Sequence, residues 1–173
     1  MTGKAPAGAR VLGSLRSANG KGVVRIEDPF DTDVADLWSA LTDPIRLAGW
    51  IGEVEGDLRK GGDFRAHFAT TGWQGIGRVE ACEPPKRLLV RSKAAGDVDE
   101  LADEVTLAPH GDRTILVIEE RGMPLDQIAA YGVGVQLHVE DLAAYITGGE
   151  RVDVGARVAE LMPGYLQLAA QLA

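Results

Sequence analysis

The sequence predicts one domain of the α+β class, in which an antiparallel sheet of about six or seven strands precedes a long C-terminal helix. The chain has 173 residues, a length that one hydrophobic core can serve. Between residues 52 and 121, apolar and polar residues alternate between recurrent turns that contain glycine or proline, as in an antiparallel meander. After Pro124, apolar residues recur at spacings of three and four, which indicates a helix.

The composition argues against several functional classes. Apolar residues make up 45% of the chain and charged residues 25%, as in a soluble globular protein. The 18 basic and 26 acidic residues give a net charge of −8, so we expect neither a nucleic-acid partner nor a membrane-surface partner. No segment approaches the ~18 consecutive apolar residues of a membrane span, and the single cysteine cannot form an intrachain disulfide. The expected location is the cytoplasm.

The first residues predict a flexible leader followed by a hairpin. Residues 1–10 are rich in alanine, glycine and proline without periodicity, and the single domain is expected to span residues 11–173. Residues 11–16 and 23–27 have the pattern of two strands, and between them Asn19 and Gly20 supply the positive φ angles that a hairpin turn requires.

Two short helices are predicted next. Asp33 suits the N-cap of the first helix, and Pro44, preceded by Asp43, suits the first turn of the second. The apolar residues at helical spacing are Val34, Leu37, Trp38 and Leu41 in the first helix and Ile45, Leu47, Ala48, Trp50 and Ile51 in the second.

Within the meander, one strand is expected to have an aromatic face, because Phe64, Ala66 and Phe68 alternate with polar residues. Residues 115–118 are continuously apolar, which is typical of a central strand buried on both sides. An acidic run is interpreted as a solvated edge around a hairpin. It consists of Asp97, Asp99, Glu100, Asp103 and Glu104.

The long helix is expected to begin near Ile128 and to end at Gly148 and Gly149. A last segment, residues 154–172, has helical spacing but contains Pro163 followed by Gly164. It is therefore interpreted as a broken helix that closes the fold.

The order of several short motifs resembles that of a known family. The motifs are VADLWSALTDP at 34–44, LAGW at 47–50, GDLRKGGDF at 56–64, GRV at 77–79, EPPKRL at 83–88 and LHVEDL at 137–142. Together they resemble the START-like, helix-grip superfamily, and within it the bacterial homologues of the activator of heat-shock-protein-90 ATPase. The chain departs from the family at Gly134-Val135, where members often have Gly-Trp.

The resemblance implies a cavity for a small hydrophobic or amphipathic ligand between the sheet and the long helix. The residues expected to contact that ligand are Trp38, Trp50, Phe64, Phe68, Trp73, Arg91, Tyr131, Val135, His138 and Leu142. For the tryptophans the alternative is a packing role in the core, and for His138 it is a hydrogen bond to a neighbour. His138 or Arg91 would fix the orientation of the ligand.

The sequence predicts no metal and no cofactor. His67 and His110 are not expected to converge with His138, and no zinc-binding spacing is present. Among the carboxylates, Glu119 near Arg121 is the candidate for an inward acid or base, with a surface position as the alternative.

Three functions are compatible with these features. The leading hypothesis is a non-catalytic carrier or sensor of a small hydrophobic molecule. The second is a cyclase, dehydratase or hydrolase acting on an aromatic or polyketide-like substrate, with His138 and Glu119 as its catalytic candidates. The third is a chaperone ATPase modulator or another protein-binding module. A homodimer, formed through the opening hairpin or the acidic edge, is left open.

Overall fold

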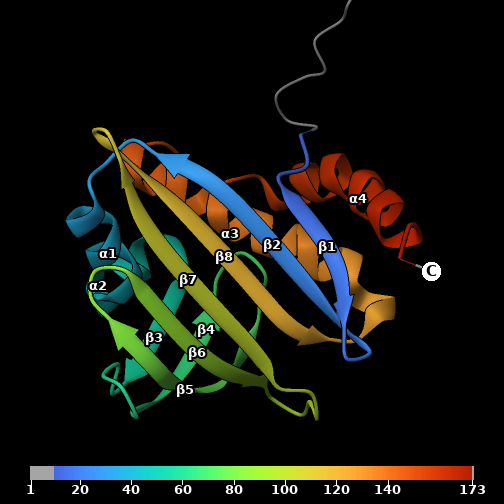
Figure 1. Ribbon diagram of the computed structural model, residues 1–173, viewed down its shortest axis with the longest axis horizontal. Coiled ribbons are helices and arrows are strands. Elements are labelled where there is room, and N and C mark those ends of the chain that lie inside the picture. Colours follow the sequence, from blue (N-terminus) through green and yellow to red (C-terminus); the bar gives the residue numbers. More distant parts are fainter. Residues whose placement is uncertain (1–9, 173) are drawn as a thin grey trace, which may run out of the picture.

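The computed structural model describes residues 10–172, which form one antiparallel sheet and four α-helices (Figure 1). The predicted leader therefore lies, except for Arg10, outside the described residues. The helices are α1 Val34–Thr42, α2 Pro44–Trp50, α3 Ile128–Thr147 and α4 Val154–Ala170, with a short 3-10 turn, η2 Leu125–Gln127, before α3. The strands are β1 Gly13–Ala18, β2 Lys21–Phe30, β3 Gly52–Gly56, β4 Asp63–Phe68, β5 Gln74–Glu83, β6 Arg87–Ala94, β7 Leu101–His110 and β8 Arg113–Met123.

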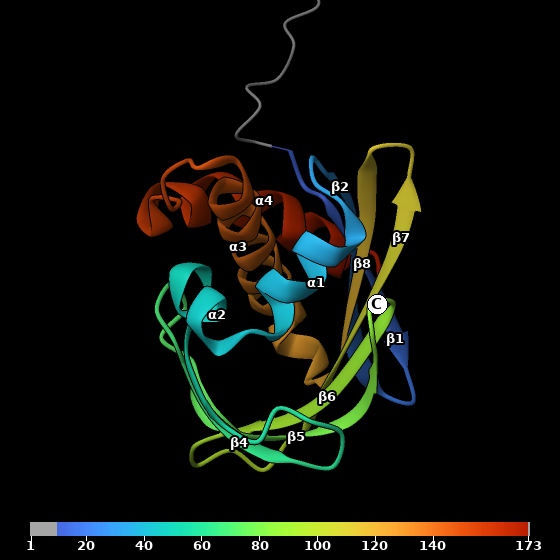
Figure 2. The same cartoon turned by 90° about the vertical axis from the view of Figure 1, so that its left-hand side faces the viewer.

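The sheet has eight strands in the order β1-β2-β8-β7-β6-β5-β4-β3, slightly more than the predicted six or seven. The short edge strand β3 is easily missed from sequence, because its five residues begin and end with glycine. The sheet bends into a trough, and α3 lies along the inside of that trough (Figure 2). The predicted α+β segregation, with a long helix held by an antiparallel sheet, is confirmed.

Local sequence signals explain several element boundaries. Asn19 and Gly20 adopt φ angles of 53° and 78° in the predicted turn between β1 and β2. The Asp33 side chain accepts a hydrogen bond from the Asp36 backbone N–H at the start of α1, and Asp43 accepts one from Ile45 at the start of α2.

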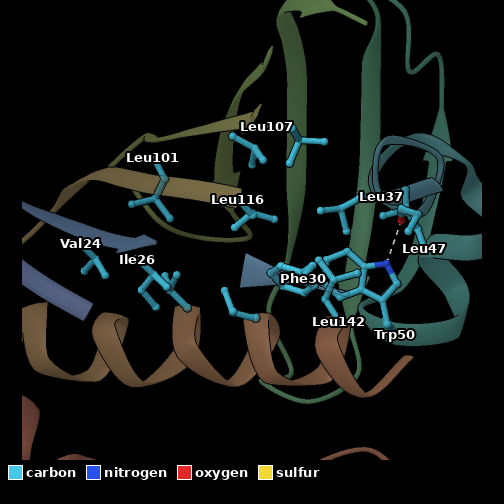
Figure 3. Packing of buried hydrophobic residues seen from close by; sticks show 14 of the residues in the cluster. Val24, Ile26, Phe30, Leu37, Leu47, Trp50, Leu101, Leu107, Leu116 and Leu142 are labelled. Atoms are coloured by element: carbon cyan, nitrogen blue, oxygen red, sulfur yellow. Dashed lines mark hydrogen bonds between the residues drawn. The ribbon is translucent and has the colours of Figure 1, made fainter. Parts of the chain in front are cut away.

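The main core lies between the sheet, α1, α2 and α3 (Figure 3). Trp50 is 5% exposed, and its indole N–H donates to the Ala40 carbonyl oxygen at 2.9 Å. This bond ties α2 to α1 while the ring packs toward Leu142 of α3 (Figure 3). The two short helices thereby close one end of the trough.

The last segment is one continuous helix, α4, and the prediction that it breaks at Pro163 is wrong. Leu161 and Tyr165, on either side of the proline, are both fully buried, and they pack in a second apolar cluster with Val133 and Leu137 of α3. Burial of these flanking side chains offsets the hydrogen bond that an interior proline removes.

A buried polar cluster joins α4, α3 and the start of the chain. The Tyr165 hydroxyl donates to Gln136 Oε1 at 2.6 Å, and the Gly13 backbone N–H donates to the Tyr165 oxygen at 3.1 Å. Gln136 Nε2 donates to Glu140, whose carboxylate also accepts from Arg157 of α4.

Among the described residues, no helix is both long and apolar enough to cross a membrane.

Candidate functional site

A cavity of about 420 Å³ lies between the inner face of the sheet and α3, and α2 and the loop between β4 and β5 complete its wall. Eight of the ten residues predicted to contact a ligand line it. They are Trp50, Phe64, Phe68, Trp73, Tyr131, Val135, His138 and Leu142. The sequence therefore identified every tryptophan, phenylalanine and tyrosine of the lining, but fewer than half of its apolar residues.

Two of the predicted ligand contacts lie elsewhere. Trp38 packs, partly buried, against the main core and does not line the cavity. Arg91 lies on the outer face of β6, where its guanidinium donates to Glu80 and Glu100. The residues on either side of it, Val90 and Ser92, line the cavity, so strand alternation directs Arg91 outward.

One wall of the cavity is aromatic. The rings of Phe68 and Trp73 stack with centroids 5.0 Å apart and planes at 28°, and the ring of His138 meets Phe68 edge-on at 5.2 Å. The Trp73 indole N–H is buried and is the one such side-chain atom without a hydrogen-bond partner among the described residues. A flat apolar ligand would find a stacking surface here.

His138 is neutral at physiological pH. Its Nε2 lies 3.4 Å from the Thr71 hydroxyl, a long contact at the cavity wall. Burial lowers the pKa of His138 to about 4, and the nearby Asp141 carboxylate only partly opposes that shift. The imidazole can therefore donate or accept one hydrogen bond, but it holds no charge and is a weak base.

Glu119 does not face the cavity, so it takes the surface position that was the alternative to an inward acid or base. It lies on the outer face of β8, where its carboxylate accepts from Arg16 at 2.7 Å and from Arg121 at 3.0 Å. Hydrogen bonds from the two guanidiniums hold the pKa of Glu119 below its usual range.

Two carboxyl groups that the sequence reasoning missed do line the cavity. Asp103 on β7 and Glu120 on β8 are directly opposite in the strand register, and their carboxyls are hydrogen-bonded to each other. Burial raises the pKa of Asp103, and it raises the pKa of Glu120 further because the Asp103 charge repels a second charge. The neutral form is therefore favoured more strongly for Glu120 than for Asp103.

A signal for this pair was present in the sequence. Glu120 lies two residues after Ile118 and four after Leu116, so alternation along β8 places all three on one face. Asp103 was assigned to a solvated edge with its acidic neighbours, although Leu101 and Val105 give it the inward parity. Because its neighbours are acidic too, Asp103 was assigned to the surface, and the two-residue alternation along the strand was not applied to it.

The other polar groups in the cavity wall are neutral. Ser92 and Tyr131 line it, and burial together with the nearby Glu120 raises the pKa of the Tyr131 phenol. No lysine or arginine belongs to the lining within residues 10–172. In that same range no group of three or more histidine, cysteine or acidic side chains has the arrangement of a metal site.

Comparisons with known proteins agree with this architecture. Residues 31–147 match the family described as Activator of Hsp90 ATPase homolog 1-like protein. The crystal structure of CalU16 from Micromonospora echinospora is 28% identical over 91% of this chain and 95% of that chain, with a TM-score of 0.76. DynU16, a protein in the dynemicin biosynthetic locus, is 28% identical over 75% of this chain and 48% of that chain, with a TM-score of 0.69.

A shorter protein has a similar fold over most of this chain. MLL2253 from Mesorhizobium loti is 27% identical, with a TM-score of 0.65, and the match covers 98% of that chain but 74% of this one. A search of curated proteins found no match.

Proposed function

The chain belongs to the Activator of Hsp90 ATPase homolog 1-like family. From that premise, we propose that it binds a small, largely apolar, ring-containing molecule between its sheet and α3. The observation that carries the proposal is the 420 Å³ cavity, whose wall combines aromatic side chains with a few polar groups. Pockets for small organic ligands have this size and composition.

The neighbouring structures support this choice. DynU16 is described as a protein in a biosynthetic locus, which is a setting in which a carrier or sensor of a small molecule would be useful. The stacked Phe68–Trp73 pair favours a planar group. Burial of the ligand's apolar surface would supply the affinity, at about 25 cal/mol per Å² before the costs of ordering.

Native mass spectrometry tests the proposal on the full chain purified gently from the organism that encodes it. We expect a bound mass on the order of a few hundred daltons that disappears on denaturation. The Gly134→Phe variant should lack this mass, because Gly134 lines the cavity, a Cβ there meets only the Thr71 methyl within 4 Å, and the phenyl ring would fill part of the space. Ile45→Phe is the control, since Ile45 is 84% exposed on α2. Equal loading of both variants would contradict the proposal.

A proton-transfer enzyme is the second candidate, and the Asp103–Glu120 pair is the observation that favours it. A protonated carboxyl beside an ionised one in an apolar cavity can act as a general acid and a base. This hypothesis predicts that Glu120→Gln abolishes turnover of a substrate identified from the bound mass, whereas Glu119→Gln on the outer face retains it. Retained turnover in Glu120→Gln would remove it.

A further inference from the structure

The acidic residues of β7 and β8 fall into two groups according to the face of the sheet. On the outer face, Glu104 accepts from Arg87 and Arg121, and Glu119 accepts from Arg16 and Arg121. On the inner face, neither Asp103 nor Glu120 has an ion pair with a basic residue in the described part of the chain. The outward carboxylates Glu104 and Glu119 thus form ion pairs with arginines, whereas the inward pair forms none with a basic residue in the described part of the chain.

An acid pair without a counter-charge is costly inside a protein. Burial raises the pKa of both groups and so favours their neutral forms, and a negative charge on either one would face a cavity lined mainly by apolar side chains. The positive charge of Arg121, on the outer face of the sheet, offsets only part of the cost for Asp103, because burial is the larger effect on its pKa. A cation inside the cavity would recover the lost solvation, whereas an anion would be repelled.

The same cavity also offers an aromatic surface. The rings of Phe68 and Trp73 are stacked with their centroids 5.0 Å apart, and both residues line the cavity. The ring of a ligand can contact this surface while its cationic group meets the carboxyl pair.

We propose that the cavity selects apolar, ring-containing ligands that carry a basic nitrogen, which binds as an ammonium group to the Asp103–Glu120 pair while the ring contacts Phe68 and Trp73. This inference rests on the proposed ligand-binding function and specifies its ligand class. It excludes carboxylated amphiphiles, such as fatty-acid anions, as the preferred occupants. The ligand keeps its own proton, and a proton held by the pair can leave to the solvent as the ammonium approaches.

A matched set of probes tests this preference by isothermal titration calorimetry on the full chain. The probes are 2-(2-naphthyl)ethylamine, 2-(2-naphthyl)ethanol and 2-naphthylacetate, which share a ring and differ in charge. We expect the amine to bind about tenfold tighter than the alcohol, and the carboxylate about tenfold weaker. Titration in two buffers of different ionisation enthalpy should also show proton release when the amine binds.

Two variants distinguish the pair from general surface charge. Asp103→Asn combined with Glu120→Gln should bring the affinities for amine and alcohol within about twofold of each other and abolish the proton release. Glu104→Gln combined with Glu119→Gln makes the same chemical changes on the same strands but on the outer face, and should preserve the wild-type order.

The results can contradict either the amine preference alone or ligand binding as a whole. If wild-type protein binds all three probes with equal affinity, the cavity binds ligands but the amine preference is wrong. The same conclusion follows if the outer-face variant loses the preference as completely as the inner-face variant. If wild-type protein binds none of the probes and carries no native adduct, ligand binding itself is wrong, and the amine preference is wrong with it.

Discussion

His138 links the chemistry of the cavity to the pH dependence of folding. Its pKa is about 4 in the folded protein against an ordinary value of 6.5, so the folded state binds fewer protons than the unfolded state between these pH values. Its contribution to stability is therefore complete above about pH 6.5 and is lost as the pH falls toward 4.

Replacing this side chain should reduce the sensitivity to acid. Between about pH 7 and pH 5, the wild-type protein should lose about 2 kcal/mol more unfolding free energy than His138→Leu, because the variant has no imidazole to protonate. Urea denaturation at the two pH values measures both losses, and the other titrating groups are common to both proteins. Parallel losses in the two proteins would mean that His138 is not held neutral.

The carboxyl pair should act in the opposite direction. The pKa values of Asp103 and Glu120 are raised, so the folded state holds more protons than the unfolded state, and their contribution falls as the pH rises through the folded pKa values. We expect Asp103→Asn to raise the unfolding free energy by about 1–2 kcal/mol near neutral pH, with no gain in acid.

The control for this prediction is Glu104→Gln on the outer face of the same strand. Hydrogen bonds from Arg87 and Arg121 lower the pKa of Glu104, so its removal should cost less than about 1 kcal/mol and should not stabilise the protein. Thermal melts at two pH values distinguish the variants. A lower melting temperature for Asp103→Asn than for wild type near neutral pH would refute the uncompensated acid pair.

Residue-level prediction from the sequence succeeded for apolar side chains and failed for charged ones. Phe64, Phe68 and Leu142 line the cavity as their periodicity predicts, because burial is decided by hydrophobicity and period together. Glu119 and Arg91 were candidates for the site because of their side-chain chemistry, but strand alternation directs both of them to the outer face. Glu119 and Glu120 are adjacent in the sequence, yet the first forms ion pairs on the outer face and the second lines the cavity.

The long helix α3 has different neighbours on its two sides. One side lines the cavity through residues such as Val135 and His138, and the other packs against α4 through Val133 and Leu137. A helix covered on both sides has no strongly polar face, which is why its apolar residues are spread around its circumference. The sequence located this helix from its spacing, but not its second partner.

Two glycines of α3 provide a matched pair of substitutions. A Cβ at Gly132 would lie 2.5 Å from the Tyr165 ring, whereas a Cβ at Gly134 would meet only Thr71 Cγ2, at 3.8 Å. We therefore expect Gly132→Ala to destabilise the protein by about 1–3 kcal/mol through overpacking. Gly134→Ala should stabilise it by up to about 1 kcal/mol, because alanine restricts the unfolded chain. Chemical denaturation of both variants checks the order, and equal effects would contradict the close packing of α4 on α3.

At the scale of the whole molecule, the class, the element order and the family were predictable. Alternation, turn spacing and the final helical period are properties of long segments, so errors at single residues do not change them. The continuity of α4 across Pro163 was not predictable, because it depends on the burial of Leu161 and Tyr165 against α3 rather than on local preference.

The family match ends at residue 147, before α4 begins. Removal of residues 150–173 should expose Ala129, Val133 and Leu137, which are buried in the cluster with α4. We expect the shortened chain to melt at least about 10 °C lower than the full chain or to aggregate, whereas Leu166→Ala, at a site 55% exposed on α4, should melt like wild type. An unchanged melting temperature of the shortened chain would show that α4 is dispensable.

The edge strand β3 also affects how the protein behaves at high concentration. The free edge of a sheet offers unpaired backbone groups to a second chain and can start strand-by-strand growth. β3 has five residues, and Glu53 and Glu55 are exposed along it. A second β3 added in antiparallel fashion would bring like charges together over a very short pairing length. This edge of the sheet can therefore remain unpaired without becoming a template for fibrils.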